Sequence, residues 1–364
     1  MTRTTHAPRA RRGVTLVEML VATAMCILGM WMLTWMFQQA TASFSLANAQ
    51  VALTGQERAV TTVMQRDLAC DVFADDDTLP NRGRKVSDRS PGDPVPKGGY
   101  LWARSSPPGV GGTILEATDS NGFASYRATD HFIQFTAILP DTPGNRFISE
   151  VPAGSGTTRA GTAAEIAYFL VPNGTTTGGA QLYDLMRVQR IVALNQYDAQ
   201  DYLNLAVQPG YQAGDLVHEV MVCSPPNTAT STPAKMHALA DLAQAVGPSG
   251  ATAPRIGGAA QYAGGPTFPR AARSLTSAPP SKRYGEDRLL SGVLSFEVKF
   301  TGQGTGWPTP FSSNSDYPYD TLPAGSNYEF DTSRSPTLKI TGVQIRIRAV
   351  NGTNTRQTTI VIAL

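Results

Sequence analysis

Cysteine and histidine are scarce in this sequence, and their spacing is not that of a metal site. The chain has three cysteines, Cys26, Cys70 and Cys223, and four histidines, with no CxxC pair and no close His/Cys grouping. Zinc sites draw their ligands from short, regular spacings of these residues. The sequence therefore predicts no metal and no cofactor.

An excess of one charge sign and the usual motifs of catalysis are also missing. Thirty basic and 28 acidic residues leave a net charge of +2, which gives no strongly basic face for nucleic acid. The stretch 247–251, GPSGA, lacks the G-x-S-x-G nucleophile elbow. The glycine-rich stretch 302–306, GQGTG, does not precede a predicted helix, so it does not indicate a phosphate-binding loop. We expect neither an enzyme nor a nucleic-acid-binding protein.

Proline is absent from Val14 to Leu79, where Gly29 and Gly55 are the only glycines. This predicts one continuous helix to about Phe73. Its second half has an apolar stripe, interrupted by Glu57, that is typical of a helix packed on a globular domain. The stripe consists of Leu46, Leu53, Val60, Met64 and Leu68.

The first part of this helix is long and apolar enough to cross a bilayer. The run from Val14 to Phe37 has 24 residues and one charge, Glu18, whereas about 20 residues suffice for a hydrocarbon core of ~30 Å. Four arginines and no acid precede it. The positive-inside rule then keeps the N-terminus in the cytoplasm and sends the rest of the chain across.

Two simpler interpretations of the run leave Glu18 unexplained. A secretory signal peptide could be cut after Ala40-Thr41-Ala42, but its apolar region would have only about 7 to 15 residues. An ordinary one-pass anchor does not require a carboxylate, and insertion of one at the centre of a bilayer costs roughly 2.5 to 3.5 kcal/mol. The sequence thus indicates that Glu18 has a partner.

The residues around Gly13 resemble a known signal. A basic leader, Gly13, then Val14-Thr15-Leu16-Val17-Glu18 and a long apolar helix are similar to the class III signal of type IV pilins and type II secretion pseudopilins. The resemblance implies that a prepilin peptidase cuts between Gly13 and Val14 and that the Val14 amine is N-methylated. The family's usual first residue is phenylalanine, from which Val14 departs. Glu18 would be the assembly contact, meeting the N-terminal amine of a neighbouring subunit.

Beyond position 79 the composition changes to that of strands and loops, with 25 of the 26 prolines. Asn351-Gly352-Thr353-Asn354 predicts a hairpin between the last two strands, and the sheet should be antiparallel. Strands are expected at 130–139, 165–171, 185–194, 289–300, 337–350 and 355–364.

The order of several short motifs resembles the J-type pseudopilin and its minor-pilin relatives. They are QRDLA at 65–69, EIAYFLV at 165–171, LYDLMRV at 182–188, LLSGVLSFEVKF at 289–300 and VQIRIRA at 343–349. The resemblance implies an α+β, pilin-like fold, in which a long N-terminal transmembrane helix packs on an antiparallel β-sheet head.

This fold divides the chain into three parts. They are a leader peptide at 1–13, a membrane and stem helix at 14–75, and an extracytoplasmic β-rich head at 76–364. An Ala-, Pro-, Gly- and Ser-rich stretch at about 225–284 is expected to be an insertion, with a short helix at roughly Ala234 to Val246.

Three further sites have weaker signals. Asp75-Asp76-Asp77 could contribute to a calcium site, but EF-hand spacing is absent and three adjacent carboxylates usually form a solvated turn, so no metal is predicted there. Cys70 and Cys223 could form a disulfide, because both would lie outside the cytoplasm. Asn173-Gly174-Thr175 and Asn351-Gly352-Thr353 match a glycosylation sequon, but we interpret both as turns.

The resulting functional prediction is a minor pseudopilin at or near the tip of a type II secretion pseudopilus, which initiates assembly or contacts cargo. The expected partners are other pseudopilins or pilins, the prepilin peptidase and the bacterial inner membrane, with the head in the periplasm. The alternatives are a minor pilin of a type IV pilus, or a single-pass membrane-anchored binding protein outside any filament.

Overall fold

The computed structural model divides the chain into two compact units, residues 1–54 and 55–364, and each is described by itself. The structure describes residues 15–74, 83–89, 93, 96–105, 113–118, 124–140, 142, 144–150, 158–177, 179–192, 216–217, 239, 283–284, 286–303, 328–332, 339–351 and 354–363. The predicted peptidase site, Gly13 and Val14, lies outside the described residues.

Helix α1 runs from Leu16 to Leu68 without interruption, as the absence of proline predicts. The prediction that it reaches Phe73 is wrong by five residues. The chain leaves the helix because Asp71 forms an antiparallel bridge with Ile138, and Phe73–Ala74 (β1) pairs with Gly83–Arg84 (β2). Pairing of the backbone with distant strands thus ends the helix where no local residue breaks it.

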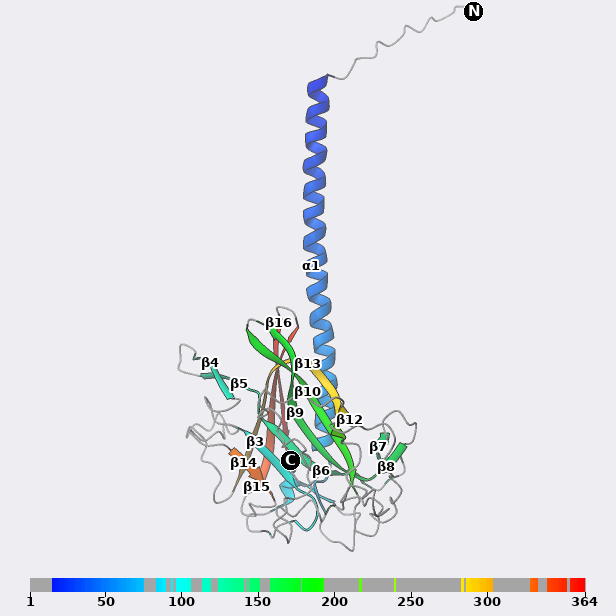
Figure 1. The fold of residues 1–364 in the computed structure, drawn as a ribbon, viewed down its shortest axis with the longest axis vertical. Coiled ribbons are helices and arrows are strands. Elements are labelled where there is room, and N and C mark those ends of the chain that lie inside the picture. Colours follow the sequence, from blue (N-terminus) through cyan, green and yellow to red (C-terminus); the bar gives the residue numbers. More distant parts are fainter. Residues whose placement is uncertain are drawn as a thin grey trace, which may run out of the picture. The chain divides into compact units, whose positions relative to one another are not determined.

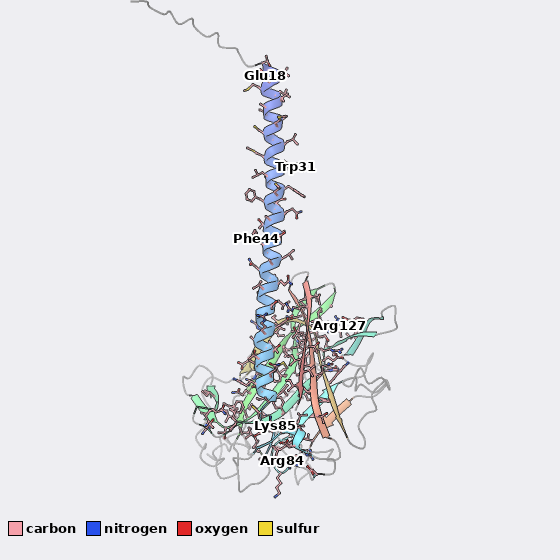
Figure 2. All side chains as sticks on the ribbon, turned by 180° about the vertical axis from the view of Figure 1, so that it is seen from behind. Glu18, Trp31, Phe44, Arg84, Lys85 and Arg127 are labelled. Carbon is pink, nitrogen blue, oxygen red and sulfur yellow. The ribbon has the colours of Figure 1, made fainter. Side chains whose placement is uncertain are left out.

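The apolar half of α1 lies in the first unit and is exposed along its length. Its most apolar stretch has no buried residues within the protein. By length and composition this helix could be a membrane anchor or a signal sequence. Figure 2 shows the side chains of this half, among them Glu18, Trp31 and Phe44, projecting outward from the helix.

The second unit is built on an eight-stranded sheet in the order β14-β3-β6-β9-β10-β13-β15-β16, in which every neighbouring pair is antiparallel (Figure 1). Its strands are β3 (Leu101–Ser105), β6 (Phe132–Ile138), β9 (Ala163–Thr177), β10 (Ala180–Val192), β13 (Glu286–Gln303), β14 (Tyr328–Asp331), β15 (Lys339–Asn351) and β16 (Asn354–Ala363). The α+β layout, with one long apolar N-terminal helix and a large antiparallel sheet, is therefore confirmed.

The smaller elements lie in the chain segments before and between the strands of this sheet. Three further two-stranded sheets and one short 3-10 helix occur among the described residues. Their bounds are β4 (Thr113–Thr118) with β5 (Ala124–Ala128), β7 (Phe147–Glu150) with β8 (Thr158–Gly161), β11 (Leu216–Val217) with β12 (Arg283–Tyr284), and η1 (Val86–Asp88).

All six predicted strands are present, and Asn351 pairs with Asn354 at the predicted hairpin. The turn predicted at Asn173 is wrong, because β9 continues to Thr177. Gly174 there has φ of +80°, and the pairing with β10 shifts register next to it. The Asn-Gly pair thus forms an irregularity within a strand, where Asn173 Nδ2 donates to Asp184 Oδ1 at 3.2 Å.

Most of the predicted insertion at 225–284 lies outside the described residues. Leu239, within its predicted helix, is helical and fully buried. It packs with Tyr100, Ile138 and Val192 in one cluster of the core, and its carbonyl accepts a hydrogen bond from Gly99 N at 3.1 Å. At least this residue of the insertion is therefore part of the folded core.

Candidate functional site

Glu18 closes a capping box at the start of α1. Thr15 precedes the first helical residue, and its hydroxyl accepts a hydrogen bond from Glu18 N at 3.2 Å. In return, Glu18 Oε2 accepts from Thr15 N at 3.0 Å and from the Thr15 hydroxyl at 3.2 Å. This reciprocal arrangement satisfies backbone donors that an α-helix leaves unpaired at its N-terminus.

The cap is a function of Glu18 that the sequence interpretation missed, although Thr15-Leu16-Val17-Glu18 has the T-x-x-E spacing of a capping box. All three bonds involve the backbone or hydroxyl of Thr15 and only one carboxylate oxygen, Oε2. Glu18 is exposed in this chain. Its other oxygen, Oε1, has no hydrogen bond within the part of the chain that the structure describes.

The end of α1 is fixed to the sheet by a buried carboxylate, Asp67. Asp67 Oδ2 accepts hydrogen bonds from Arg187 Nε at 2.6 Å and from the Tyr168 hydroxyl at 2.5 Å. The side chains of Asp67 and Arg187 are 0% and 6% exposed. We call Asp67, Tyr168 and Arg187 the Asp67 junction.

The sheet register explains why these two partners meet Asp67. Arg187 in β10 is paired directly with Tyr168 in β9, so their side chains lie on the same face of the sheet. Each partner lies in a different motif, because Asp67 is in QRDLA, Tyr168 in EIAYFLV and Arg187 in LYDLMRV. Three motifs that the sequence could only place in order thus converge on one contact.

Electrostatics at this junction keep Arg187 charged and Tyr168 neutral. Burial alone would lower the pKa of Arg187, but the charge of Asp67 and the hydrogen bond to it raise that pKa above its ordinary value. Burial and the negative charge of Asp67 raise the pKa of Tyr168 well above its ordinary value. The tyrosine therefore remains a hydrogen-bond donor and the arginine a cation.

Cys70 lies beside the junction as a free thiol. Its Sγ donates to the carbonyl of Arg66 at 3.4 Å. Burial and the charge of Asp67 raise the pKa of Cys70 to about 11, so the thiol is protonated and unreactive at neutral pH. Cys223, its proposed disulfide partner, lies outside the described residues.

A second buried carboxylate, Glu57, links α1 to the last strand. Glu57 is 4% exposed, and its Oε2 lies 2.6 Å from Nε of Arg356 in β16. The geometry is that of an ion pair, since neither oxygen of Glu57 has a directed hydrogen bond. Glu57, which interrupts the apolar stripe in the sequence, is therefore a buried charge that is paired with Arg356.

A third carboxylate, Glu165, is fully enclosed within the sheet. It is paired with Arg190, both side chains being 0% exposed, and Arg190 Nε donates to Oε2 at 3.0 Å. Gln134 Nε2 donates to Oε1 at 2.7 Å, and the Tyr100 hydroxyl donates to the same atom. Both carboxylate oxygens thus have donors, which suits a structural role in the core.

The described residues contain no group of three or more His, Cys, Asp or Glu side chains that could hold a metal ion. The acidic triplet considered for calcium, Asp75-Asp76-Asp77, lies outside them.

Comparisons with known proteins identify no relative. No family model, no curated protein and no solved structure matches the chain. Among the described residues, the carboxylates near the two ends of α1 differ, because Glu18 is exposed and Asp67 is buried.

Proposed function

We propose that this chain is a minor pseudopilin, a structural subunit placed at or near the tip of a type II secretion pseudopilus, where it initiates assembly or contacts cargo. The observation that carries the proposal is the pairing of an exposed apolar helix with an exposed Glu18 at its start. A helix that remains alone in lipid uses one oxygen of that carboxylate for its own cap, whereas a helix that packs among identical or similar stems also gains a charged contact through the other oxygen.

The chemistry of assembly follows from the two oxygens of Glu18. Oε2 accepts the cap bonds of its own helix, which leaves Oε1 for a donor from a neighbour. A new N-terminal amine, produced by cleavage between Gly13 and Val14, carries a positive charge that suits this oxygen. In a bundle of apolar stems such a pair is specific, because a subunit in the wrong register would leave a charge uncompensated at a cost of about 3 to 5 kcal/mol.

The Asp67 junction is consistent with a helix that must stay attached to the sheet when the subunit is held in a filament. A filament subunit is held by its helix and presents its globular domain, so the helix must not detach from the sheet. The buried charge of Asp67 is bonded to two adjacent strands, β9 and β10. Withdrawing the helix would expose or leave unpaired both a carboxylate and a guanidinium, which is far more costly than sliding an apolar contact.

In this proposal the chain spans the bacterial inner membrane once, with the N-terminus cytoplasmic and the sheet domain periplasmic. Its partners are the prepilin peptidase and other pseudopilins. A minor pilin of a type IV pilus fits the same features, and the genes beside this one separate the two versions. A membrane-anchored binding protein that never enters a filament would instead keep an unprocessed N-terminus.

Two substitutions separate the charge of Glu18 from its role in the cap. Glu18→Gln removes the charge but keeps an oxygen acceptor, since glutamine also serves in a capping box. Thr15→Val removes the cap hydroxyl at a cost of about 0.5 to 2 kcal/mol and keeps the charge of Glu18. The measurement is co-isolation of partner pseudopilins from detergent-solubilised membranes, scored beside the N-terminal peptide of each variant.

We expect both variants to be inserted and cut after Gly13, because the resemblance implies that the peptidase depends mainly on the glycine. Partner recovery should fall for Glu18→Gln and be retained for Thr15→Val. Normal recovery of partners by a correctly cut Glu18→Gln protein would overturn the assembly role. An equal fall in both variants would assign the defect to the helix cap instead.

A further inference from the structure

Two tryptophans stand exposed on one face of the apolar half of α1. The side chains of Trp31 and Trp35 are 70% and 56% exposed, and Figure 2 shows Trp31 projecting from the helix. Residues four apart on an α-helix lie on the same face, only about 40° apart around the axis. Two such large rings on a helix whose apolar half is exposed throughout indicate a surface that contacts a membrane or another protein.

The polar residues on either side define the length of the apolar stretch. Between Glu18 and Gln38 the only hydroxyl side chains are Thr23 and Thr34, and both donate back to carbonyls of their own helix. Apart from the weakly polar thiol of Cys26, the stretch therefore offers no hydrogen-bonding side chain to its surroundings except the indoles. Twenty residues at 1.5 Å each make about 30 Å, which is the thickness of a hydrocarbon core.

The tryptophans lie at one end of this stretch. Trp35 precedes Gln38 by three residues and Trp31 by seven, so they lie about 4.5 and 10 Å from the Gln38 boundary. No tryptophan or tyrosine occurs near Glu18 at the opposite end. An indole has a large apolar body and one N–H donor, and it is most stable where hydrocarbon meets the head groups.

We propose that Trp35 and, one turn deeper on the same face, Trp31 form an interfacial anchor at the extracytoplasmic surface, in which the Trp35 indole reaches the phospholipid head-group region and the Trp31 indole packs beneath it. The inference rests on the proposed function for the bilayer span and for its orientation. The anchor sets the depth of the helix, and because both rings lie on one face it also sets its rotation and tilt. It acts on the single subunit before assembly.

The depth has a consequence for Glu18. With Trp35 at the outer boundary of a ~30 Å core, Glu18 is about 25 Å deeper, which places it roughly 5 Å inside the inner boundary. The anchor thus holds the carboxylate in a partly apolar layer near the inner boundary.

The test measures the depth of the indoles in the full-length chain, reconstituted in phosphatidylcholine vesicles. The lipid carries bromine either near the glycerol backbone or near the methyl end of its acyl chains. Bromine quenches indole fluorescence on contact, and the signal lost in Trp31→Phe/Trp35→Phe gives the part due to these two residues. Leu28→Trp in that double variant is the matched control, because residue 28 lies ten residues from both Glu18 and Gln38.

We expect the Trp31 and Trp35 signal to be quenched more strongly by the shallow bromine, and the Leu28→Trp signal by the deep one. Equal depth for the pair and the control would overturn the anchor. Resistance of the pair to both bromines would also overturn it and would assign this face to contact with protein. The readout is distinct from the proposed function, since a simple membrane anchor with an uncut N-terminus would still place its indoles at the surface.

Discussion

Replacement of Asp67 by asparagine tests whether a buried ion pair fixes α1 to the sheet. Asparagine keeps an oxygen that can accept one hydrogen bond, but it leaves the guanidinium of Arg187 without its nearest charge. Arg187 is 6% exposed, and its other carboxylate, Asp287, lies 3.7 Å away on a side chain that is 70% exposed. Asp287 therefore compensates the charge only weakly.

The magnitude follows from these contacts. Breaking a buried pair by removing one partner costs about 3 to 5 kcal/mol. Because asparagine retains an acceptor, we expect Asp67→Asn to lower the free energy of unfolding by about 3 kcal/mol. This is a large fraction of a typical free energy of unfolding of about 5 to 15 kcal/mol. At a few degrees per kcal/mol, the melting temperature should fall by roughly 6 to 12 °C.

The assay is urea and thermal unfolding of the fragment 41–364, which lacks the apolar run and which we expect to fold as a β-rich monomer, followed by circular dichroism. Arg66→Gln is the matched control, because Arg66 also contacts Asp67, at 3.1 Å, but its side chain is 63% exposed. An exposed ion pair contributes about 0 to 1 kcal/mol. Asp67→Asn/Arg187→Met removes both charges and should regain much of the loss. The reasoning is refuted if Asp67→Asn destabilises the fragment no more than Arg66→Gln does.

Two further predictions concern the same unit. The pKa of Cys70 is raised to about 11 in the folded protein, whereas it is about 8.5 in an unfolded chain. As the pH rises, the unfolded state therefore loses this proton first. The free energy of unfolding should fall between about pH 8.5 and pH 11. Unfolding of Cys70→Ala should show a shallower decline over that range, by on the order of 1 to 2 kcal/mol after allowance for partial exposure, and an unchanged slope would contradict the pKa. Truncation after Val350 removes β16 and exposes the edge of β15. We expect the truncated fragment to aggregate, as measured by light scattering. A truncated fragment that stayed monomeric and had the melting temperature of the full one would show that β16 does not stabilise the sheet.

The periodic features of this chain could be predicted from the sequence, and its long-range charge pairs could not. The six strands and the Asn351 hairpin follow from local alternation and turn chemistry. Asp67, however, meets Tyr168 and Arg187 across 101 and 120 residues, and no local rule gives the register that brings them together. Glu57 likewise finds Arg356 at the far end of the chain.

Two errors show where local interpretation fails. The helix ends at Leu68 because the following backbone pairs with distant strands, which outweighs helix propensity. Asn173-Gly174 has the composition of a turn, but the long pairing of β9 with β10 holds it inside a strand. The capping box of Thr15 and Glu18, by contrast, is local and could have been recognised from its T-x-x-E spacing.

The N-terminal peptide of the mature protein tests the pseudopilin assignment most directly. Mass spectrometry of the protein isolated from its native host should find a peptide that begins at Val14 and carries one added methyl group. A chain that still begins at Met1 would indicate a membrane anchor outside any filament. A chain that begins at Ser43, after Ala40-Thr41-Ala42, would indicate a cleaved secretory signal, and either result would contradict the account.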